Sequence, residues 1–216
     1  MYWTRLLLAA FAMVISGMAS AFDECGSLEN GYGPFDYRTS KQELAIVDTH
    51  HFNSDVEQLR RGISGPIGGE LDYTLRAAPN HHRALMAMVN LALKVGNEKP
   101  QGANYTVSCY FDRAMRFAAD DGTVRMIHGI YLSKVGKKRE ALKRFEEARS
   151  LSKENANIHY NLGLLYFDLK DYDNALLNAQ KAYQLGFELP GLKNKLVGAG
   201  RWRDPGPVDK APRPAE

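Results

Sequence analysis

The sequence predicts an all-α protein, an α-solenoid of stacked helix-turn-helix units, preceded by a cleaved signal peptide and an irregular N-terminal segment. Residues 122–155 and 156–189 are similar segments of 34 residues, and the pairs Gly129/Gly163, Ala141/Ala175 and Ala148/Ala182 are each 34 positions apart. Within each segment, apolar residues recur three or four positions apart, which is typical of amphipathic helices. A period of this length indicates paired helices stacked in a row.

The composition is that of an ordinary globular chain. Of 216 residues, 44% are hydrophobic and 25% charged, which is enough for one domain with a core. The formal net charge is only +3, and no block of basic residues marks a nucleic-acid partner. We therefore expect neither nucleic-acid binding nor a cofactor.

Residues 1–21 have the pattern of a signal peptide. Arg5 precedes an apolar run from Leu6 to Ile15, and Ala19-Ser20-Ala21 supplies small residues for cleavage. The run is shorter than the roughly 20 residues that a bilayer span needs. We expect cleavage after Ala21, an exported protein that is periplasmic or secreted, and no stable membrane span.

The chain has two cysteines, Cys25 and Cys109. Export to an oxidising compartment favours a disulfide between them. The alternative is two separate buried thiols. A disulfide would tie the N-terminal segment to the middle of the fold.

The two regular segments resemble the tetratricopeptide repeat (TPR) family. Leu162-Gly163, Tyr166, Ala175 and Ala182 fit its signature, and Gly129, Ala141, Phe145 and Ala148 fit it one unit earlier. The chain departs from the signature at Lys153 and Phe187, which replace a helix-ending proline, and at His128, where leucine is usual. The resemblance implies paired helices and a role in binding other proteins.

Extending this register backwards gives a repeat domain over 48–200. It comprises a degenerate repeat at 48–81, a repeat at 82–121 with an insertion within 96–105, the repeats at 122–155 and 156–189, and a cap at 190–200. Residues 22–47 form the irregular N-terminal segment. Residues 201–216 are proline-rich and polar, which predicts a disordered tail.

Two histidine pairs, His50-His51 and His81-His82, raise the question of a metal site. Adjacent side chains on a helix point about 100° apart, so a neighbouring pair rarely binds one ion. The second pair lies at a corner between two repeats, after a proline. We expect it to pack or cap helices there, and we expect no metal site; zinc binding is the alternative.

The resemblance also implies a peptide-binding groove. Ligand contacts in this family usually come from fixed positions of each repeat's first helix, and these carry over to Phe52, Val56, Arg83, Met86, Asn90, Met126, Ile130, Tyr160, Leu164 and Phe167. This mainly apolar face suits an amphipathic helix or an extended apolar peptide. The alternative is that the aromatic and glycine-rich segment 22–38 fills the groove or covers the first repeat.

The leading functional hypothesis is an exported protein that binds another protein, as a scaffold or assembly factor in the cell envelope. A small-molecule or lipid carrier that uses the apolar groove is the second hypothesis. An enzyme or metal-binding protein that uses the four paired histidines is the third. No catalytic residues are predicted, because the sequence contains no phosphate loop and no nucleophile motif.

Overall fold

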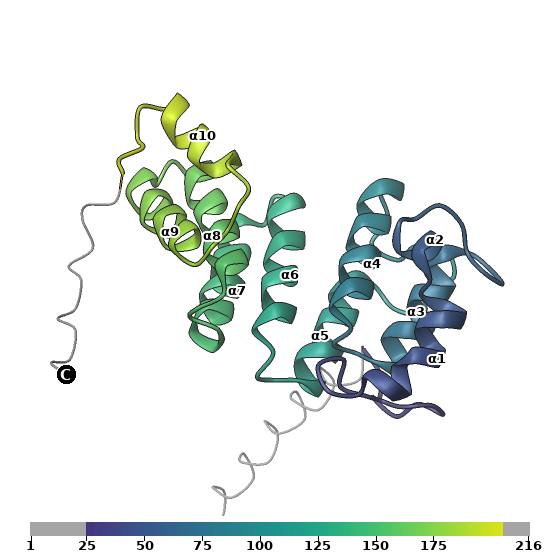
Figure 1. Ribbon diagram of the computed structural model, residues 1–216. Helices are drawn as coiled ribbons and strands as arrows, with labels where there is room; N and C mark the ends of the chain where they lie inside the picture. Colours follow the sequence, from purple (N-terminus) through teal and green to yellow (C-terminus); the bar gives the residue numbers. More distant parts are fainter. Residues whose placement is uncertain (1–24, 205–216) are drawn as a thin grey trace, which may run out of the picture.

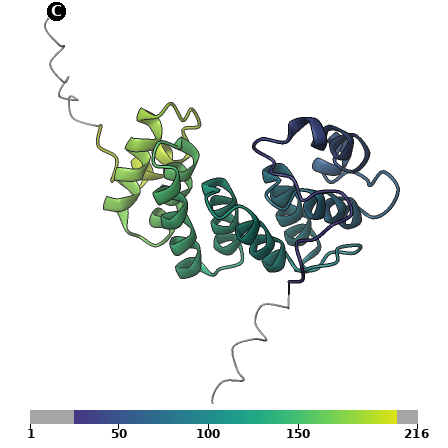
Figure 2. The ribbon, with the colours of Figure 1, turned by 90° about the horizontal axis from the view of Figure 1, so that it is seen from below.

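The computed structural model describes residues 25–204, which contain ten helices and no strand (Figure 1). The helices are α1 (Lys41–His51), α2 (Ser54–Glu57), α3 (Ile67–Ala77), α4 (His82–Val95), α5 (Val107–Phe117), α6 (Gly122–Lys134), α7 (Lys138–Leu151), α8 (Ala156–Asp168), α9 (Tyr172–Gln184) and α10 (Gly191–Gly198). They follow one another in a row from α1 at one end to α10 at the other (Figure 2). The fold is therefore the predicted all-α stack. The predicted signal peptide and residues 205–216 lie outside the described residues.

Two regular helix pairs, α6/α7 and α8/α9, lie within the predicted repeats 122–155 and 156–189. Small residues let the paired helices approach closely. Ala141 and Ala175 are fully buried. A Cβ atom placed on Gly129 would lie 3.0 Å from the Phe145 ring, so the second helix leaves no room for a side chain there. A Cβ atom on Gly163 would lie 3.3 Å from the Ala175 carbonyl oxygen of α9 and 2.6 Å from Leu192 Cδ2 of α10.

The unit formed by α4 and α5 carries the predicted insertion, which is the loop from Gly96 to Thr106. Its far end is held by the carboxylate of Asp72 in α3. Asn104 donates to it from its backbone N–H (3.1 Å) and its side-chain Nδ2 (2.8 Å), and the Tyr110 hydroxyl also donates to it. Helix α5 is thus hydrogen-bonded to α3 through Tyr110 and Asp72. It packs less closely along α4 than α7 packs along α6.

The first unit departs from the predicted boundary between residues 47 and 48. Helix α1 begins at Lys41, so the last seven residues of the predicted irregular segment, 41–47, are helical. Leu44 and Val47 are buried against Ala77 and Ala78. The apolar residues of α1 are the consecutive run from Leu44 to Val47, which has no helical spacing and so does not reveal a helix in the sequence.

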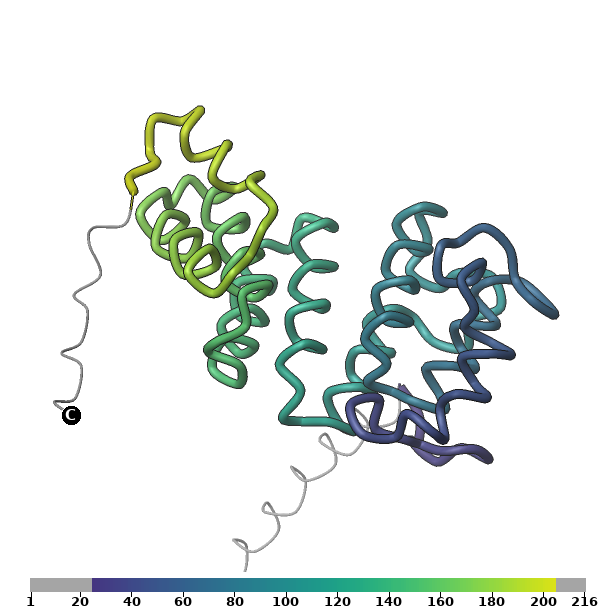
Figure 3. The backbone as a smooth tube through the Cα atoms, in the orientation of Figure 1, coloured from purple at the N-terminus to yellow at the C-terminus, as the bar shows by residue number. Residues whose placement is uncertain are grey.

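The N-terminal strap, residues 25–40, runs along the second helices of the first units. Cys25 and Cys109 form a disulfide with an S–S distance of 2.03 Å. The Phe35 N–H then donates to the Ala77 carbonyl of α3 (2.8 Å), and the Tyr37 N–H donates to Asn80 Oδ1 (3.0 Å). Figure 3 shows the start of the coloured tube, in purple, passing below the lower ends of the neighbouring helices. The described strap therefore covers α5, α3 and the α3–α4 corner.

Helix α10 covers the far end of the stack, within the predicted cap 190–200. Leu192 and Leu196 are fully buried and pack with Ala175 and Ala179 of α9. Terminal repeats expose an apolar face that needs such cover. No helix between residues 25 and 204 has the length and apolar character of a membrane span.

Candidate binding surfaces

His81 caps helix α4. Its ring is fully buried, and its Nδ1 accepts the Ala84 N–H at 3.1 Å. Because Nδ1 accepts, the proton is on Nε2, which donates to Asp48 Oδ1 of α1 at 3.1 Å. Burial lowers the pKa of His81, and the hydrogen bond to Asp48 only partly offsets this. The capping expected of this histidine is confirmed, and the neutral imidazole also joins α1 to α4.

His82 takes part in a second corner contact, centred on Asp121. Its Nε2 lies 2.8 Å from Asp121 Oδ2, which also accepts from Asn80 Nδ2 at 3.1 Å. The other carboxylate oxygen of Asp121 accepts the N–H groups of Thr123 and Val124, which caps α6. Burial opposes ionisation of Asp121, but these hydrogen bonds outweigh it and hold the pKa of the carboxyl below its ordinary value.

The two histidines of the upstream pair, His50 and His51, have different surroundings. His50 is exposed, whereas His51 stacks on Tyr73 with ring centroids 3.8 Å apart. His51 Nδ1 lies 2.8 Å from Glu70 Oε2. Each of His51, His81 and His82 thus has its own carboxylate partner. Within residues 25–204, no three His, Cys, Asp or Glu side chains are grouped so as to hold a metal ion.

The predicted groove residues fall into three groups. Phe52 and Val56 are buried in the main core, with 3% and 0% of their surface exposed. They cannot contact a ligand in this conformation, which corrects their assignment to the groove. The reason is that Val56 lies on α2, which packs against α3 and α4, and Phe52 ends α1; both side chains face the main core instead of solvent.

At the other end, Tyr160, Leu164 and Phe167 of α8 pack against the cluster that α10 completes. Tyr160 stacks on Phe187 with ring centroids 3.9 Å apart. Their contacts are therefore largely internal, although each keeps part of its surface exposed. Nothing in the sequence pattern of α8 alone indicates this cover.

The middle group, Met86, Asn90, Met126 and Ile130, remains open, and we call it the α4–α6 strip. Met86 and Asn90 are four residues apart on α4, and Met126 and Ile130 are four apart on α6, so each pair shares a helix face. The three apolar side chains pack against the core from outside and are half-buried, while Asn90 is exposed. Helices α4 and α6 are in direct contact.

Arg83 lies beside the strip but is already paired. Its Nε donates to Glu57 Oε1 at 2.7 Å, and its guanidinium lies 5.5 Å from the centre of the Phe52 ring. The pair is exposed and joins α2 to α4. Arg83 therefore borders the strip with a structural partner of its own.

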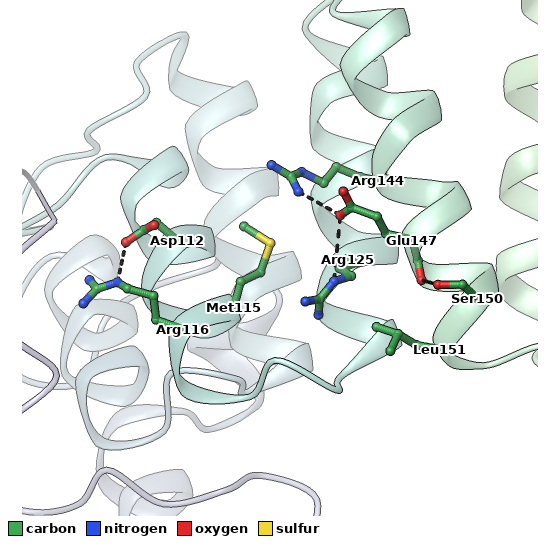
Figure 4. A pocket seen from close by; sticks show the side chains of 8 residues that line it. All are labelled: Asp112, Met115, Arg116, Arg125, Arg144, Glu147, Ser150 and Leu151. Carbon is green, nitrogen blue, oxygen red and sulfur yellow. Dashed lines mark hydrogen bonds and ion pairs between the residues drawn. The ribbon is translucent and has the colours of Figure 1, made fainter. Parts of the chain in front are cut away.

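A cleft of about 490 Å³ lies between α5, α6 and α7, and we call it the α5–α7 cleft. None of the predicted groove residues lines it. Its lining is Asp112, Met115, Arg116, Arg125, Arg144, Glu147, Ser150 and Leu151 (Figure 4). The arginines come from three helices without a common spacing, so no local pattern marks them in the sequence. Arg144 donates to Glu147 at 2.8 Å and not to Glu140, its i−4 neighbour.

His128 is buried at a repeat position where leucine is usual. Its ring stacks on Phe111 with centroids 4.4 Å apart, and among the described residues its Nδ1 has no hydrogen-bond partner. Burial lowers the pKa of His128 to about 4, and the positive charges of Arg144 and Lys137 act in the same direction. The side chain therefore replaces the usual leucine as a neutral aromatic ring.

Comparison with known proteins identifies the repeat class. The family model described as TPR repeat matches residues 134–170, which contain the last residue of α6 and all of α7 and α8. The chain thus contains a segment that matches a tetratricopeptide repeat, as its sequence resemblance predicts. Such repeats generally mediate protein–protein interaction and are typically not enzymes. No curated protein matches this chain.

Proposed function

We propose that this is an exported protein that binds another protein through the α4–α6 strip, as a scaffold or assembly factor in the cell envelope. The observation that supports this best is the strip itself. It places Met86, Met126 and Ile130 half-buried on two contacting helices, between an end covered by α2 and an end covered by α10. The apolar side chains on these two helices, with the polar Asn90 at their edge, suit the apolar face of a partner helix.

The composition of the strip also supports a protein ligand. Methionine side chains are flexible and polarisable, so they adapt to the apolar residues of a partner. Half-burial means that the surface is already supported by the core and needs little ordering when a ligand binds. The partner's helix would present residues at i, i+3 or i+4 to this strip.

Two features support the exported location. Residues 1–21 have the charge, apolar run and small-residue site of a signal peptide. The disulfide between Cys25 and Cys109 belongs to an oxidising compartment. N-terminal sequencing of protein recovered from cells tests this part; a chain that begins at Met1 would contradict it.

The binding part is tested by capture from an envelope extract with the chain 22–216 and a Met86→Ala/Met126→Ala variant. The matched control is Leu177→Ala/Val197→Ala, which truncates two exposed apolar residues on α9 and α10. We expect one partner to be retained by the unchanged chain and by the control, and lost by the strip variant. Equal retention by all three folded chains would show that the strip is not the binding surface.

A further inference from the structure

The α5–α7 cleft is separate from the α4–α6 strip and differs from it in chemistry. Three guanidinium groups reach it from three helices, Arg116 from α5, Arg125 from α6 and Arg144 from α7 (Figure 4). Two carboxylates, Asp112 and Glu147, lie among them. The lining therefore carries a net positive charge.

The ion pairs in the cleft leave its arginines under-neutralised. Arg116 Nε donates to Asp112 at 2.7 Å, which forms one complete pair. Glu147 is shared, since Arg144 Nη1 lies 2.8 Å from its Oε2 and Arg125 Nε lies 3.8 Å from the same atom. Arg125 Nη1 also donates to the Asp121 carbonyl at 3.3 Å. A guanidinium has five N–H donors, so both Arg125 and Arg144 can still donate to a further carboxylate.

Apolar side chains stand beside these charges. Met115 lies on α5 between Asp112 and Arg116, and Leu151 closes the end of α7 with 42% of its surface exposed. A single inorganic anion would leave this apolar surface and most of the 490 Å³ unused. The lining instead matches a ligand that has carboxylates and an apolar side chain close together.

We propose that the α5–α7 cleft binds an acidic peptide segment of a partner protein, in which carboxylate side chains alternate with aliphatic ones. The carboxylates bind Arg125 and Arg144, and an aliphatic side chain packs on Met115 and Leu151. Charge complementarity identifies the ligand, because the three guanidinium groups of the lining outnumber its two carboxylates. This surface would give the protein a second point of attachment, independent of the α4–α6 strip.

Fluorescence anisotropy tests the proposal directly. A fluorescein-labelled hexapeptide, Glu-Leu-Asp-Leu-Glu-Asp, is titrated with the chain 22–216, beside its neutral counterpart Gln-Leu-Asn-Leu-Gln-Asn. The Arg125→Gln/Arg144→Gln variant should weaken binding at least about tenfold, since charge-assisted hydrogen bonds are lost. The matched control Arg139→Gln/Lys143→Gln removes the same charge from exposed positions of α7 and should change affinity less than about twofold.

A second pair of variants guards against loss of folding in the double arginine variant. Leu151→Asp places a carboxylate at an exposed position of the cleft and should repel the acidic peptide. Leu177→Asp adds the same charge at an exposed position of α9 and should leave binding unchanged. Circular dichroism confirms that each variant is folded.

Several results would overturn the proposal. The proposal is wrong if the acidic peptide does not bind at millimolar concentration or if the neutral peptide binds equally well. It is also wrong if the control Arg139→Gln/Lys143→Gln weakens binding as much as the cleft variant does, or if Leu151→Asp leaves binding unchanged. Complete competition by equimolar succinate would identify a small-dicarboxylate site instead.

Discussion

Acidification should destabilise the repeat domain through His128, and His128→Leu should remove that contribution. The folded chain holds the His128 ring neutral because it is buried, with a pKa of about 4 against an ordinary value of 6.5. Below pH 6.5 the unfolded chain therefore binds more protons than the folded one. The stability that this histidine contributes is present above pH 6.5 and is lost as the pH falls toward 4.

The size of the effect follows from the two pKa values. Linkage between a folded pKa of about 4 and an unfolded pKa of 6.5 gives a loss of about 2.5 kcal/mol in the free energy of unfolding between pH 8 and pH 4.5. Since only 8% of the residue is exposed, solvent screens little of this. At pH 8 the leucine variant should be at least as stable as the unchanged chain, because a buried Nδ1 without a partner among the described residues costs about 1–3 kcal/mol.

Urea denaturation followed by circular dichroism at both pH values measures this. Other titrating groups contribute alike to both chains, so the quantity of interest is the difference between their pH-dependent losses. His50→Leu, at an exposed position of α1, is the matched control and should behave like the unchanged chain. The reasoning is wrong if His128→Leu loses as much stability on acidification as the unchanged chain does.

Three further predictions concern the corner, the strap and the cap. His81→Ala should lower the free energy of unfolding by at least about 1 kcal/mol, the usual value of a helix N-cap, and unchanged urea midpoints would contradict the capping role. Reducing the disulfide of Cys25 with dithiothreitol should lower the free energy of unfolding by about 4.5 kcal/mol, the chain-entropy value for a loop of this length. A fall in the urea midpoint measures this loss, and an unchanged midpoint in a reduced, alkylated sample would contradict it. Gly163→Ala should lower the melting temperature because its Cβ would meet Leu192 at 2.6 Å, whereas Gly198→Ala, which has open space around it, should not; equal shifts would refute this.

The regular part of the fold was predictable because its signals are local. Gly129, Ala141 and their counterparts 34 residues later fix how closely two helices pack, and that requirement repeats with each unit. The strap contacts were not predictable in the same way. Tyr37 reaches Asn80 across 43 positions, and no spacing in the sequence relates them.

The candidate sites show the same division. The α4–α6 strip follows from repeat register, since Met86 and Met126 occupy equivalent positions. Phe52 and Val56 were misassigned because Phe52 ends α1, Val56 lies on the short helix α2, and both face the core, which repeat register does not anticipate. The α5–α7 cleft depends on how α5, α6 and α7 are placed relative to one another, which becomes visible only in three dimensions.

The disulfide has a mechanical consequence for a protein that is pulled at its ends. It closes residues 25–109 into a covalent ring, and the α6–α10 part of the stack lies outside that ring. A force applied between the two ends of the described chain is therefore borne by the bond and by residues 110–204, while α1 to α4 carry no tension. Under load the C-terminal repeats would extend first, and the N-terminal half, including Met86 and Asn90 of the strip, would keep its shape.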